Sequence, residues 1–420
     1  MLRTACAALV ATFFAASSAH ADTICEWTDF SGRVGKAAMP PPKPGVPPAP
    51  DHARYYSQVA LAMFEAVNSI DRRYESYLKL PVADRAASQD AAAATAAYTV
   101  LLSHFPAQKA TLDDNYAIAM EAVADAAARE AGRGVGETAA RAALAAGRID
   151  PAVRQTPFRP RTTPGVLTAT QLPVIEPWAV TFKPWFLPSL DAVRPAPPPA
   201  LTSERWARDF DEVKRLGARD SAARTPHQTL MARYRITPDM TPSLRGIADA
   251  PGRSLVRNAR LFALMEMVAD DAGSANAAAK LHYAFWRPIS AIRNAADDGN
   301  PATAPDPGWA PLINTPNHPE YPCGHCTYAR AAASVLTAEV GASPPGGVRV
   351  SSASIPDSLV QVLPSYDAWV RDVSLSRILG GVHYRFSNEA GEEIGRRVAA
   401  LALAGHMRPL AGGGAAAGAE

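Results

Sequence analysis

The spacing of apolar residues constrains the fold of this 420-residue chain more than any other feature. Between Tyr56 and Ile70, apolar side chains recur every three or four residues, which places them on one face of a helix. Similar alanine-rich stretches follow along most of the chain, and alanine is the best helix former. No stretch shows the sustained apolar–polar alternation of a half-buried strand. The sequence therefore predicts an all-α fold.

One proline-rich stretch precedes the predicted helices, and a second lies between two groups of them. Residues 39–50 and 151–203 hold many of the 38 prolines, which exclude regular helix there. The second stretch also carries Trp178, Phe182, Trp185 and Phe186, and aromatic side chains at that density usually pack on something. Besides the helix around 56–70, helices are predicted at 88–105, 107–133, 134–148, 203–216, 225–235, 254–279 and 327–340. A last helix follows residue 388 and runs to about residue 404.

The N-terminus has the pattern of a secretory signal peptide. Arg3 precedes a short apolar run, and Ala19-His20-Ala21 forms a small-residue cleavage site, so cleavage is predicted after Ala21. A periplasmic or secreted location follows. The mature chain has no further long apolar run, so we expect no membrane span. Three cysteines remain after cleavage, enough for one disulfide and one free thiol.

These patterns give a domain organisation with two packed helical bundles and long Pro-rich connections. The predicted parts are a signal peptide at 1–21, a Pro-rich N-terminal arm at 22–50, an N-terminal helical region with the irregular crossing segment at 51–202, a helical core at 203–410 and a disordered tail at 411–420.

Composition excludes two classes of protein. Charged residues are 20% and hydrophobic residues 48% of the chain, which is enough apolar material for a core and too little charge for an intrinsically disordered protein. Lys and Arg number 42 against 40 Asp and Glu, so the basic excess typical of nucleic-acid binders is missing. We expect no nucleic-acid partner.

The first of three segments that carry chemistry contains Lys280 and Arg287. They lie seven residues apart, close to two helical turns, so both would project from nearly the same helix face. Pro288 would end that helix, because a proline disfavours the helical conformation of the preceding residue. Two cations on one face can hold an oxyanion, the guanidinium by paired hydrogen bonds. Taken alone, the pair could equally be a solvent-facing basic stripe.

The second segment, 321–326, places Gly324 where a helix is predicted to start. The unpaired amides and the dipole of a helix N-terminus favour an anion at that point. His325 would lie beside the anion as a general acid or base. A buried structural histidine is the alternative interpretation.

The third segment contains Arg377 and His383 on either side of the glycine pair 380–381. Glycine lets the chain bend, so the two side chains can converge despite a spacing that a continuous helix would splay apart. Ser387 or Asn388 could cap the helix that follows.

Together, the three segments resemble the signature of the vanadium-dependent haloperoxidase and type 2 phosphatidic acid phosphatase superfamily. That signature is Lys-x6-Arg-Pro, then Pro-Ser-Gly-His, then Ser-Arg-x5-His-x3-Asp, and this chain has the same order and internal spacings. The likeness to the soluble, exported bacterial haloperoxidase branch extends over about residues 50–405. It implies an active site in the C-terminal helical bundle.

The resemblance implies an oxyanion-binding role for five residues. Lys280, Arg287 and Arg377 would hold the equatorial oxygens of vanadate, or of phosphate as a competing oxyanion. The Gly324 amide would add a donor, and Cys323 would face the anion in place of the motif's serine.

Three histidines receive catalytic roles from the same resemblance. His383 would bind vanadium, or form a phosphohistidine in a phosphatase. His325 would be the acid–base residue. His318 lies where haloperoxidases place a histidine or an aromatic residue, and histidine is commoner in the bromide-oxidising enzymes. We expect the cations, Gly324, His325 and His383 to surround one pocket, as oxyanion chemistry requires converging donors.

Two positions depart from the signature, because Cys323 replaces its serine and Ser387 its last aspartate. A thiol donates a weaker hydrogen bond than a hydroxyl and is an oxidation target beside peroxide. A bridge between Cys323 and Cys326 that gates the site is a further interpretation. A disulfide oxidoreductase would need a βαβ scaffold, and a zinc site formed by His318, Cys323, His325 and Cys326 would leave the three cations without a use.

The leading hypothesis is a vanadium haloperoxidase-like enzyme that oxidises a halide or a small organic substrate with hydrogen peroxide. The alternatives are an acid phosphatase that uses the same pocket, which the missing aspartate disfavours, and a non-catalytic or redox-gated oxyanion-binding protein. The sequence leaves a homodimer open.

Overall fold

The computed structural model describes residues 22–38, 54–148, 162–170, 174, 182–355 and 360–411. The predicted signal peptide, the proline-rich stretch 39–50, Trp178 with most of the irregular segment before 182, and the tail from 412 lie outside the described residues.

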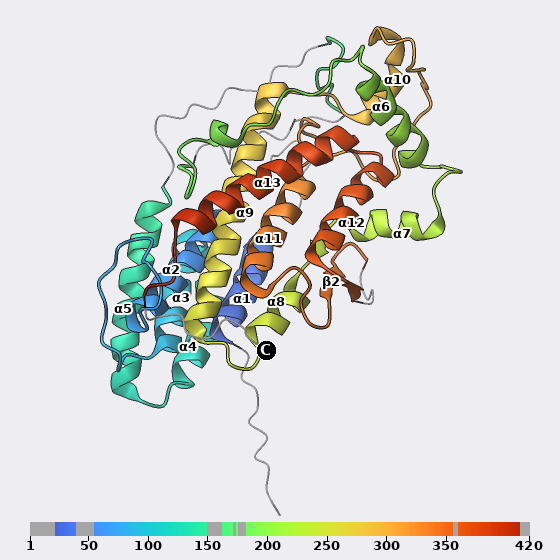
Figure 1. The fold of residues 1–420 in the computed structure, drawn as a ribbon. Coiled ribbons are helices and arrows are strands. Elements are labelled where there is room, and N and C mark those ends of the chain that lie inside the picture. Colours follow the sequence, from blue (N-terminus) through green and yellow to red (C-terminus); the bar gives the residue numbers. More distant parts are fainter. Residues whose placement is uncertain are drawn as a thin grey trace, which may run out of the picture.

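Two helical bundles pack on each other, as the sequence predicts (Figure 1). The N-terminal bundle consists of α1 (Thr23–Ala38), α2 (Arg54–Ile70), α3 (Gln89–His104), α4 (Lys109–Glu121) and α5 (Ala126–Ala146). The C-terminal bundle consists of α9 (Leu255–Tyr283), α11 (Gly324–Val340), α12 (Tyr366–Leu379) and α13 (Arg385–Gly405).

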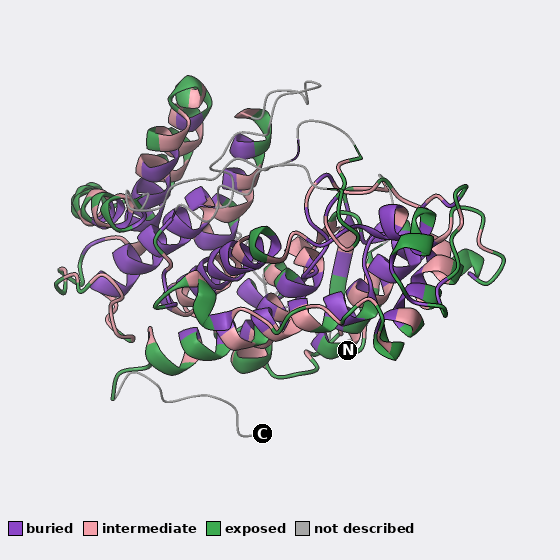
Figure 2. Ribbon diagram, turned by 90° about the horizontal axis from the view of Figure 1, so that it is seen from above, coloured by how far each residue is buried: buried purple, intermediate pink, exposed green. Residues whose placement is uncertain are grey.

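The long helix α9 joins the bundles, because it contacts α2 on one side and α11 and α13 on the other. Its buried residues lie on most of its circumference, from Val256 to Lys280. Figure 2 shows how burial differs across the molecule: central helices are largely buried (purple), and outer helices are exposed (green) on their outward faces. A helix that is buried nearly all round belongs to a core. Lys280, near the C-terminal end of α9, is therefore enclosed by protein.

Shorter elements complete the C-terminal half. They are α6 (Glu204–Gly217), α7 (Pro226–Tyr234), α8 (Thr241–Ala248), α10 (Pro288–Arg293) and the 3₁₀ turns η1 (Pro106–Gln108), η3 (Leu190–Val193) and η4 (Ala295–Asp297). A small antiparallel sheet has the order β1 (Pro238–Asp239), β2 (Val348–Ser352), β3 (Gln361–Leu363), with Pro238 opposite Ser352 and Val348 opposite Leu363. Its strands are too short for a visible alternation, which is why the sequence pattern does not reveal them.

The prediction of a Pro-rich arm over residues 22–50 is wrong for its first part. Residues 23–38 contain no proline and form α1, whose Ile24, Trp27, Phe30 and Val34 are buried at helical spacing.

The predicted break between residues 133 and 134 is also misplaced. The chain turns at 122–125, where the Asp125 carboxylate accepts hydrogen bonds from the amides of Ala127 (2.9 Å) and Ala128 (3.0 Å) and so caps α5.

Close contact between α13 and α11 depends on glycine. A Cβ at Gly391 would lie 2.3 Å from the Cys323 carbonyl oxygen, and one at Gly395 would lie 2.3 Å from that of Thr327. Helices can approach this closely only where the side chain is missing. The start of α13 is therefore held against the start of α11, which brings two of the three signature segments together.

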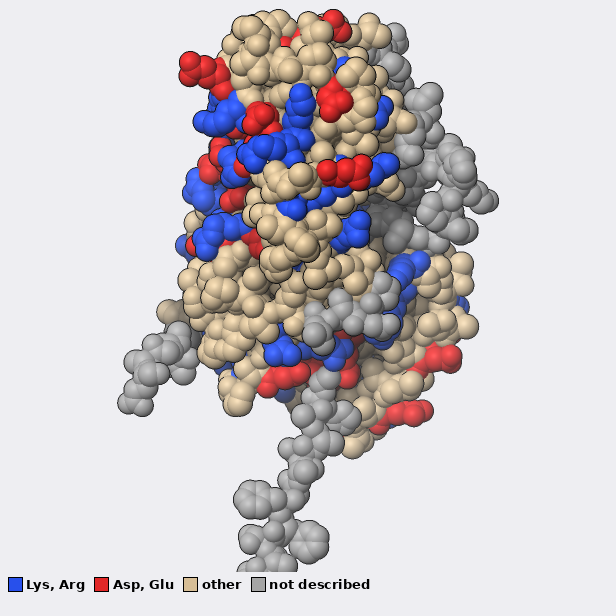
Figure 3. Space-filling model, turned by 90° about the vertical axis from the view of Figure 1, so that its right-hand side faces the viewer, with Lys and Arg blue, Asp and Glu red and all other residues tan. Residues whose placement is uncertain are grey.

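Basic and acidic side chains lie interspersed on the face of the molecule drawn in Figure 3, in keeping with the near-neutral composition. None of the helices that the structure describes is long and apolar enough to cross a membrane.

Candidate functional site

Lys280 and Arg287 converge on one loop, although they do not share a helix. The predicted common helix is interrupted, because α9 ends at Tyr283 and Ala284 adopts a left-handed conformation with φ 45°. Arg287 instead has an extended backbone and precedes α10, with Pro288 at the first helical position. Pro288 thus starts a helix, and the prediction that it ends the previous one is wrong, because α9 already ends at Tyr283.

The loop 318–320 receives hydrogen bonds from both cations. Lys280 Nζ donates to the carbonyl oxygens of Pro319 (2.9 Å) and Glu320 (2.8 Å), and Arg287 Nε donates to that of His318 (3.0 Å). Lys280 is 5% exposed and Arg287 is fully buried. Two charges enclosed this completely indicate a site for a compensating anion.

The Arg287 guanidinium lies between two of the predicted histidines. Its Nη1 is 3.2 Å from His383 Nε2 and donates to the Val382 carbonyl oxygen at 2.8 Å. Its Nη2 is 3.1 Å from His318 Nδ1. One guanidinium therefore joins the first and third signature segments with His318, which lies just before the second.

Glu320 completes this cluster and is the residue that sequence reasoning missed. Its Oε1 lies 2.7 Å from His383 Nδ1 and accepts a hydrogen bond from the Tyr384 amide at 3.2 Å. No spacing rule connects it to His383, 63 positions later in the chain. The only available signal was an acidic residue next to the predicted helix start in a segment without other charges.

Arg377 and His325 hydrogen-bond to the segment 235–236 and interact with the cluster through charge. Gly381 has φ 75°, and a Cβ there would lie 2.5 Å from the Gly217 carbonyl oxygen, so only glycine allows the bend that follows Arg377. Arg377 donates from Nη2 to the Arg235 carbonyl oxygen at 2.7 Å, and His325 Nε2 donates to that of Ile236 at 2.9 Å.

The electrostatic interactions show that these groups act on one another. The charges of Arg287, Lys280 and Arg377 all lower the pKa of His383, after burial as the main cause. The same three cations lower the pKa of His325.

Burial dominates the pKa of every charged group here. It lowers that of Lys280 well below its usual value, that of Arg287 to about 10 and that of Arg377 to about 9. It also raises the pKa of Glu320 to about 7, partly offset by Arg287 and Lys280. Lys280 and Arg287 thus face a single carboxylate, Arg377 is repelled by Arg287 and Arg235, and a bound anion would relieve the repulsion among these cations.

Gly324 is the first residue of α11, as the sequence predicts, with Cys323 at the N-cap. Cys323 and Cys326 form a disulfide, and both are fully buried. The structure thus has the bridge that was the alternative interpretation, and Cys323 cannot donate to an anion in the serine's place, because a disulfide sulfur carries no proton. Instead, Cys323 Sγ accepts from the Cys326 amide at 3.2 Å and acts as the helix cap.

Ser387 does not cap α13, which begins two residues earlier at Arg385. Its side chain is buried within the first turn, where its Oγ lies 3.5 Å from His383 Nδ1. Within the described ranges, no group of three or more His, Cys, Asp or Glu side chains could hold a metal ion. The zinc alternative also loses Cys323 and Cys326, because their sulfur atoms are paired with each other.

We expect His325 to stay neutral between pH 5 and 8 in the anion-free protein. Burial first, then the charge of Arg377, lower its pKa to about 3. A bound oxyanion would cancel part of that charge and raise this pKa, so binding would take up protons. A pH titration of the histidine ring signals by NMR, assigned with His325→Gln and run with and without phosphate, measures both effects. Titration near pH 6.5 without phosphate would contradict the burial argument.

Part of the chain matches a known protein family. Residues 260–412, which contain all three signature segments, match the family described as the VCPO second helical-bundle domain. This C-terminal part of the chain belongs to the vanadium haloperoxidase superfamily. Among curated proteins, it is similar to the vanadium chloroperoxidase of Curvularia inaequalis, with 42% identity over 83 residues. The match spans 17% of this chain and 13% of the length of that relative.

Solved structures extend the likeness of the superfamily fold to nearly the whole chain. A bacterial vanadium-dependent iodoperoxidase matches with a TM-score of 0.73 and 19% identity, covering 92% of this chain and 97% of its own. The apo form of a bacterial vanadium-dependent chloroperoxidase matches with a TM-score of 0.63 and 17% identity, covering 87% and 95%. At these identities the likeness concerns the fold.

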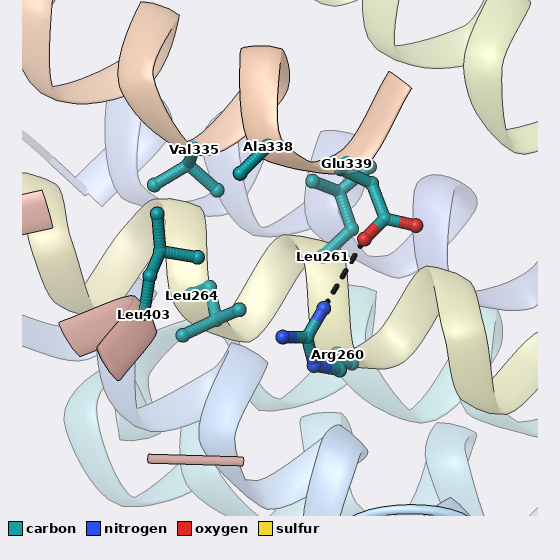
Figure 4. A pocket seen from close by; sticks show the side chains of 7 residues that line it. All are labelled: Arg260, Leu261, Leu264, Val335, Ala338, Glu339 and Leu403. Atoms are coloured by element: carbon teal, nitrogen blue, oxygen red, sulfur yellow. Dashed lines mark hydrogen bonds and ion pairs between the residues drawn. The ribbon is translucent and has the colours of Figure 1, made fainter. Parts of the chain in front are cut away.

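A small cavity lies far from this cluster, between α9, α11 and α13 (Figure 4). Its volume is about 30 Å³, and Arg260, which pairs there with Glu339 at 3.1 Å, precedes Lys280 by twenty residues on α9, or about 30 Å of helix. The space suits a water molecule rather than a substrate.

Proposed function

We propose that this superfamily member is a vanadium-dependent haloperoxidase-like enzyme, which oxidises halide with hydrogen peroxide at vanadate bound to His383. The observation that carries the proposal is the placement of Arg287 between His318 and His383, beside a second buried cation, Lys280. Oxyanions of vanadium and phosphorus carry several negative oxygens, and buried Arg and Lys donors match that charge.

The donor set fits vanadate in all but one position. His383 Nε2 would be the ligand, because its lone pair faces Arg287, whereas Lys280, Arg287 and Arg377 can only donate hydrogen bonds. Lys280, Arg287 and Arg377 would hold the oxygens, with the Gly324 amide at the start of α11. The exception is Cys323, whose disulfide sulfur offers no proton.

When bound, vanadate supplies a Lewis acid that polarises peroxide. The protein contributes positive charge and proton transfer. Since His325 is neutral near neutral pH, it can accept a proton from an incoming peroxide and return it to a leaving oxygen. His318, held by Arg287 and 3.1 Å from the Pro319 carbonyl oxygen, would orient the neighbouring donors.

Phosphomonoester hydrolysis is the second candidate, and one observation favours it. The missing signature aspartate counted against a phosphohistidine mechanism, yet Glu320 places a carboxylate on His383 Nδ1 at 2.7 Å. A histidine held in this way can attack phosphorus through Nε2, with His325 protonating the leaving group. A protein without turnover, gated by the Cys323–Cys326 disulfide, is the third candidate.

We also propose that the protein works in the periplasm or outside the cell. The predicted signal peptide over residues 1–21 supports this, and so does the Cys323–Cys326 disulfide, since such bonds persist in oxidising compartments.

Parallel assays on the mature chain distinguish the candidates. We expect oxidation of iodide or bromide that requires both orthovanadate and hydrogen peroxide and that phosphate inhibits by competition. Hydrolysis of p-nitrophenyl phosphate without halide oxidation would instead favour the phosphatase, and inactivity in both assays would favour the non-catalytic protein. His227 lies on the exposed face of α7, so His227→Ala is the control for removing a histidine outside the site.

A further inference from the structure

We infer that Glu320 is the positioning residue for His383, holding the imidazole with its proton on Nδ1 and the lone pair of Nε2 turned toward the cations. The inference rests on the proposed oxyanion site and assigns to Glu320 the part of the missing signature aspartate.

Contacts on the Nδ1 side show why the ring is fixed. Glu320 Oε1 accepts from His383 Nδ1 at 2.7 Å and from the Tyr384 amide at 3.2 Å, so one oxygen anchors a side chain and the adjoining backbone. The side chains of His383 and Glu320 are 4% and 0% exposed. Since water does not compete in such an enclosed pair, the hydrogen bond has a single geometry.

Contacts on the Nε2 side require the same tautomer independently. Arg287 Nη1 lies 3.2 Å from His383 Nε2, and a guanidinium has only donors. Nε2 must therefore accept, which leaves the proton of the neutral ring on Nδ1, where Glu320 receives it. Glu320 at Nδ1 and Arg287 at Nε2 thus both favour the tautomer whose Nε2 lone pair is directed toward the proposed oxyanion site.

Glu320 also links the histidine to a cation. Its carbonyl oxygen accepts from Lys280 Nζ at 2.8 Å while its carboxylate holds His383. Ser387, at the signature position of the aspartate, has its Oγ at 3.5 Å from Nδ1 and is the more distant partner. The carboxylate thus comes from the segment that precedes α11 rather than from α13.

Asp209 provides a matched control. This buried carboxylate accepts from the Phe386 amide at 3.0 Å, also at the start of α13, and from Arg208 Nε at 2.9 Å, rather than from His383. We expect its removal to disturb the start of α13 and to leave the imidazole of His383 in place.

The test combines tautomer and affinity measurements on the full mature chain. In long-range ¹H–¹⁵N spectra of ¹⁵N-histidine-labelled protein at pH 7.5, assigned with His383→Ala, we expect the Nδ1–H form of His383 in the wild type. In Glu320→Ala we expect a mixture or the Nε2–H form. Calorimetry with orthovanadate and with inorganic phosphate should show vanadate binding weakened about 10- to 100-fold in this variant. Phosphate binding should change far less, because phosphate needs the cations and not a lone pair.

The ratio of the two affinities separates positioning from a structural role. A collapsed pocket would weaken both anions together, and Asp209→Ala should leave the ratio and the tautomer unchanged. Glu320→Gln should keep the Nδ1–H form, because its amide oxygen can still accept from His383 and Tyr384. If Glu320→Ala does not fold, the wild-type tautomer and Glu320→Gln decide the question.

Three results would overturn the inference. They are an Nε2–H form in the wild type, loss of the Nδ1–H form in Asp209→Ala as well, and an unchanged affinity ratio in Glu320→Ala. If the wild type binds neither anion, the proposed function fails, whereas vanadate binding with an unchanged ratio refutes the role of Glu320 alone.

Discussion

Replacing His383 with alanine is expected to abolish vanadate-dependent halide oxidation, lowering kcat about 10³-fold or more. Among the groups that meet at the site, Lys280, Arg287 and Arg377 can only donate hydrogen bonds, so none can replace the lone pair of His383 Nε2. The variant leaves Glu320 near Arg287 and Lys280, whose charges stabilise the carboxylate, so the fold should persist.

Steady-state assays of His383→Ala, with circular dichroism as the check on folding, measure this effect. His227→Ala should match the wild type, because that side chain lies on the exposed face of α7. Residual activity above about a tenth of the wild-type rate, dependent on vanadate, would show that His383 is not the ligand.

The second large effect concerns Cys323. Cys323→Ser is expected to tighten orthovanadate binding about 10- to 100-fold, the value of one charge-assisted hydrogen bond of about 1.5–3 kcal/mol. The disulfide sulfur cannot donate to an oxyanion, whereas a serine hydroxyl can donate to it and still accept from the Cys326 amide as the cap of α11.

Two further variants separate the effect of the new hydroxyl on vanadate binding from the effect of losing the disulfide. Cys326→Ser also breaks the disulfide but leaves a thiol at position 323, and a thiol is a weak donor, so its gain should be smaller. Cys25→Ser, at a free buried cysteine in α1, should have no effect. If Cys323→Ser and Cys326→Ser tighten vanadate binding equally, the loss of the disulfide and not the hydroxyl is responsible. That result would favour the third candidate, a protein gated by this disulfide.

Much of the fold follows from local patterns in the sequence. The alanine-rich spacing predicts the helices and their two bundles, because burial of an apolar face is encoded within each helix. The conformation of Ala284, which separates Lys280 from Arg287, has no such local cause, since alanine rarely adopts a positive φ. The Ala284 carbonyl oxygen accepts a hydrogen bond from the distant Leu167 amide at 2.7 Å, a tertiary contact that sequence spacing does not reveal. The spacing of Lys280 and Arg287 alone therefore suggests one continuous helix.

The candidate site shows the same division. Lys280, Arg287 and His383 follow from the ordered segments of the signature. The structure joins Arg287 directly to His383 and holds Lys280 and Arg287 on the same loop, 318–320. Glu320 could not be predicted, because its contact with His383 arises only when two distant segments pack together. Pairing of Cys323 with Cys326 was one of several interpretations, since a C-x-x-C pattern alone fits a bridge, a metal site or a redox pair.

A ⁵¹V NMR spectrum of the mature protein with one equivalent of orthovanadate tests the central claim, that His383 and the buried cations form one vanadate site. We predict a bound signal, distinct from free vanadate, that excess phosphate displaces and that His383→Ala lacks. A spectrum of free vanadate alone for the wild type, or a bound signal that persists in His383→Ala, would contradict the account.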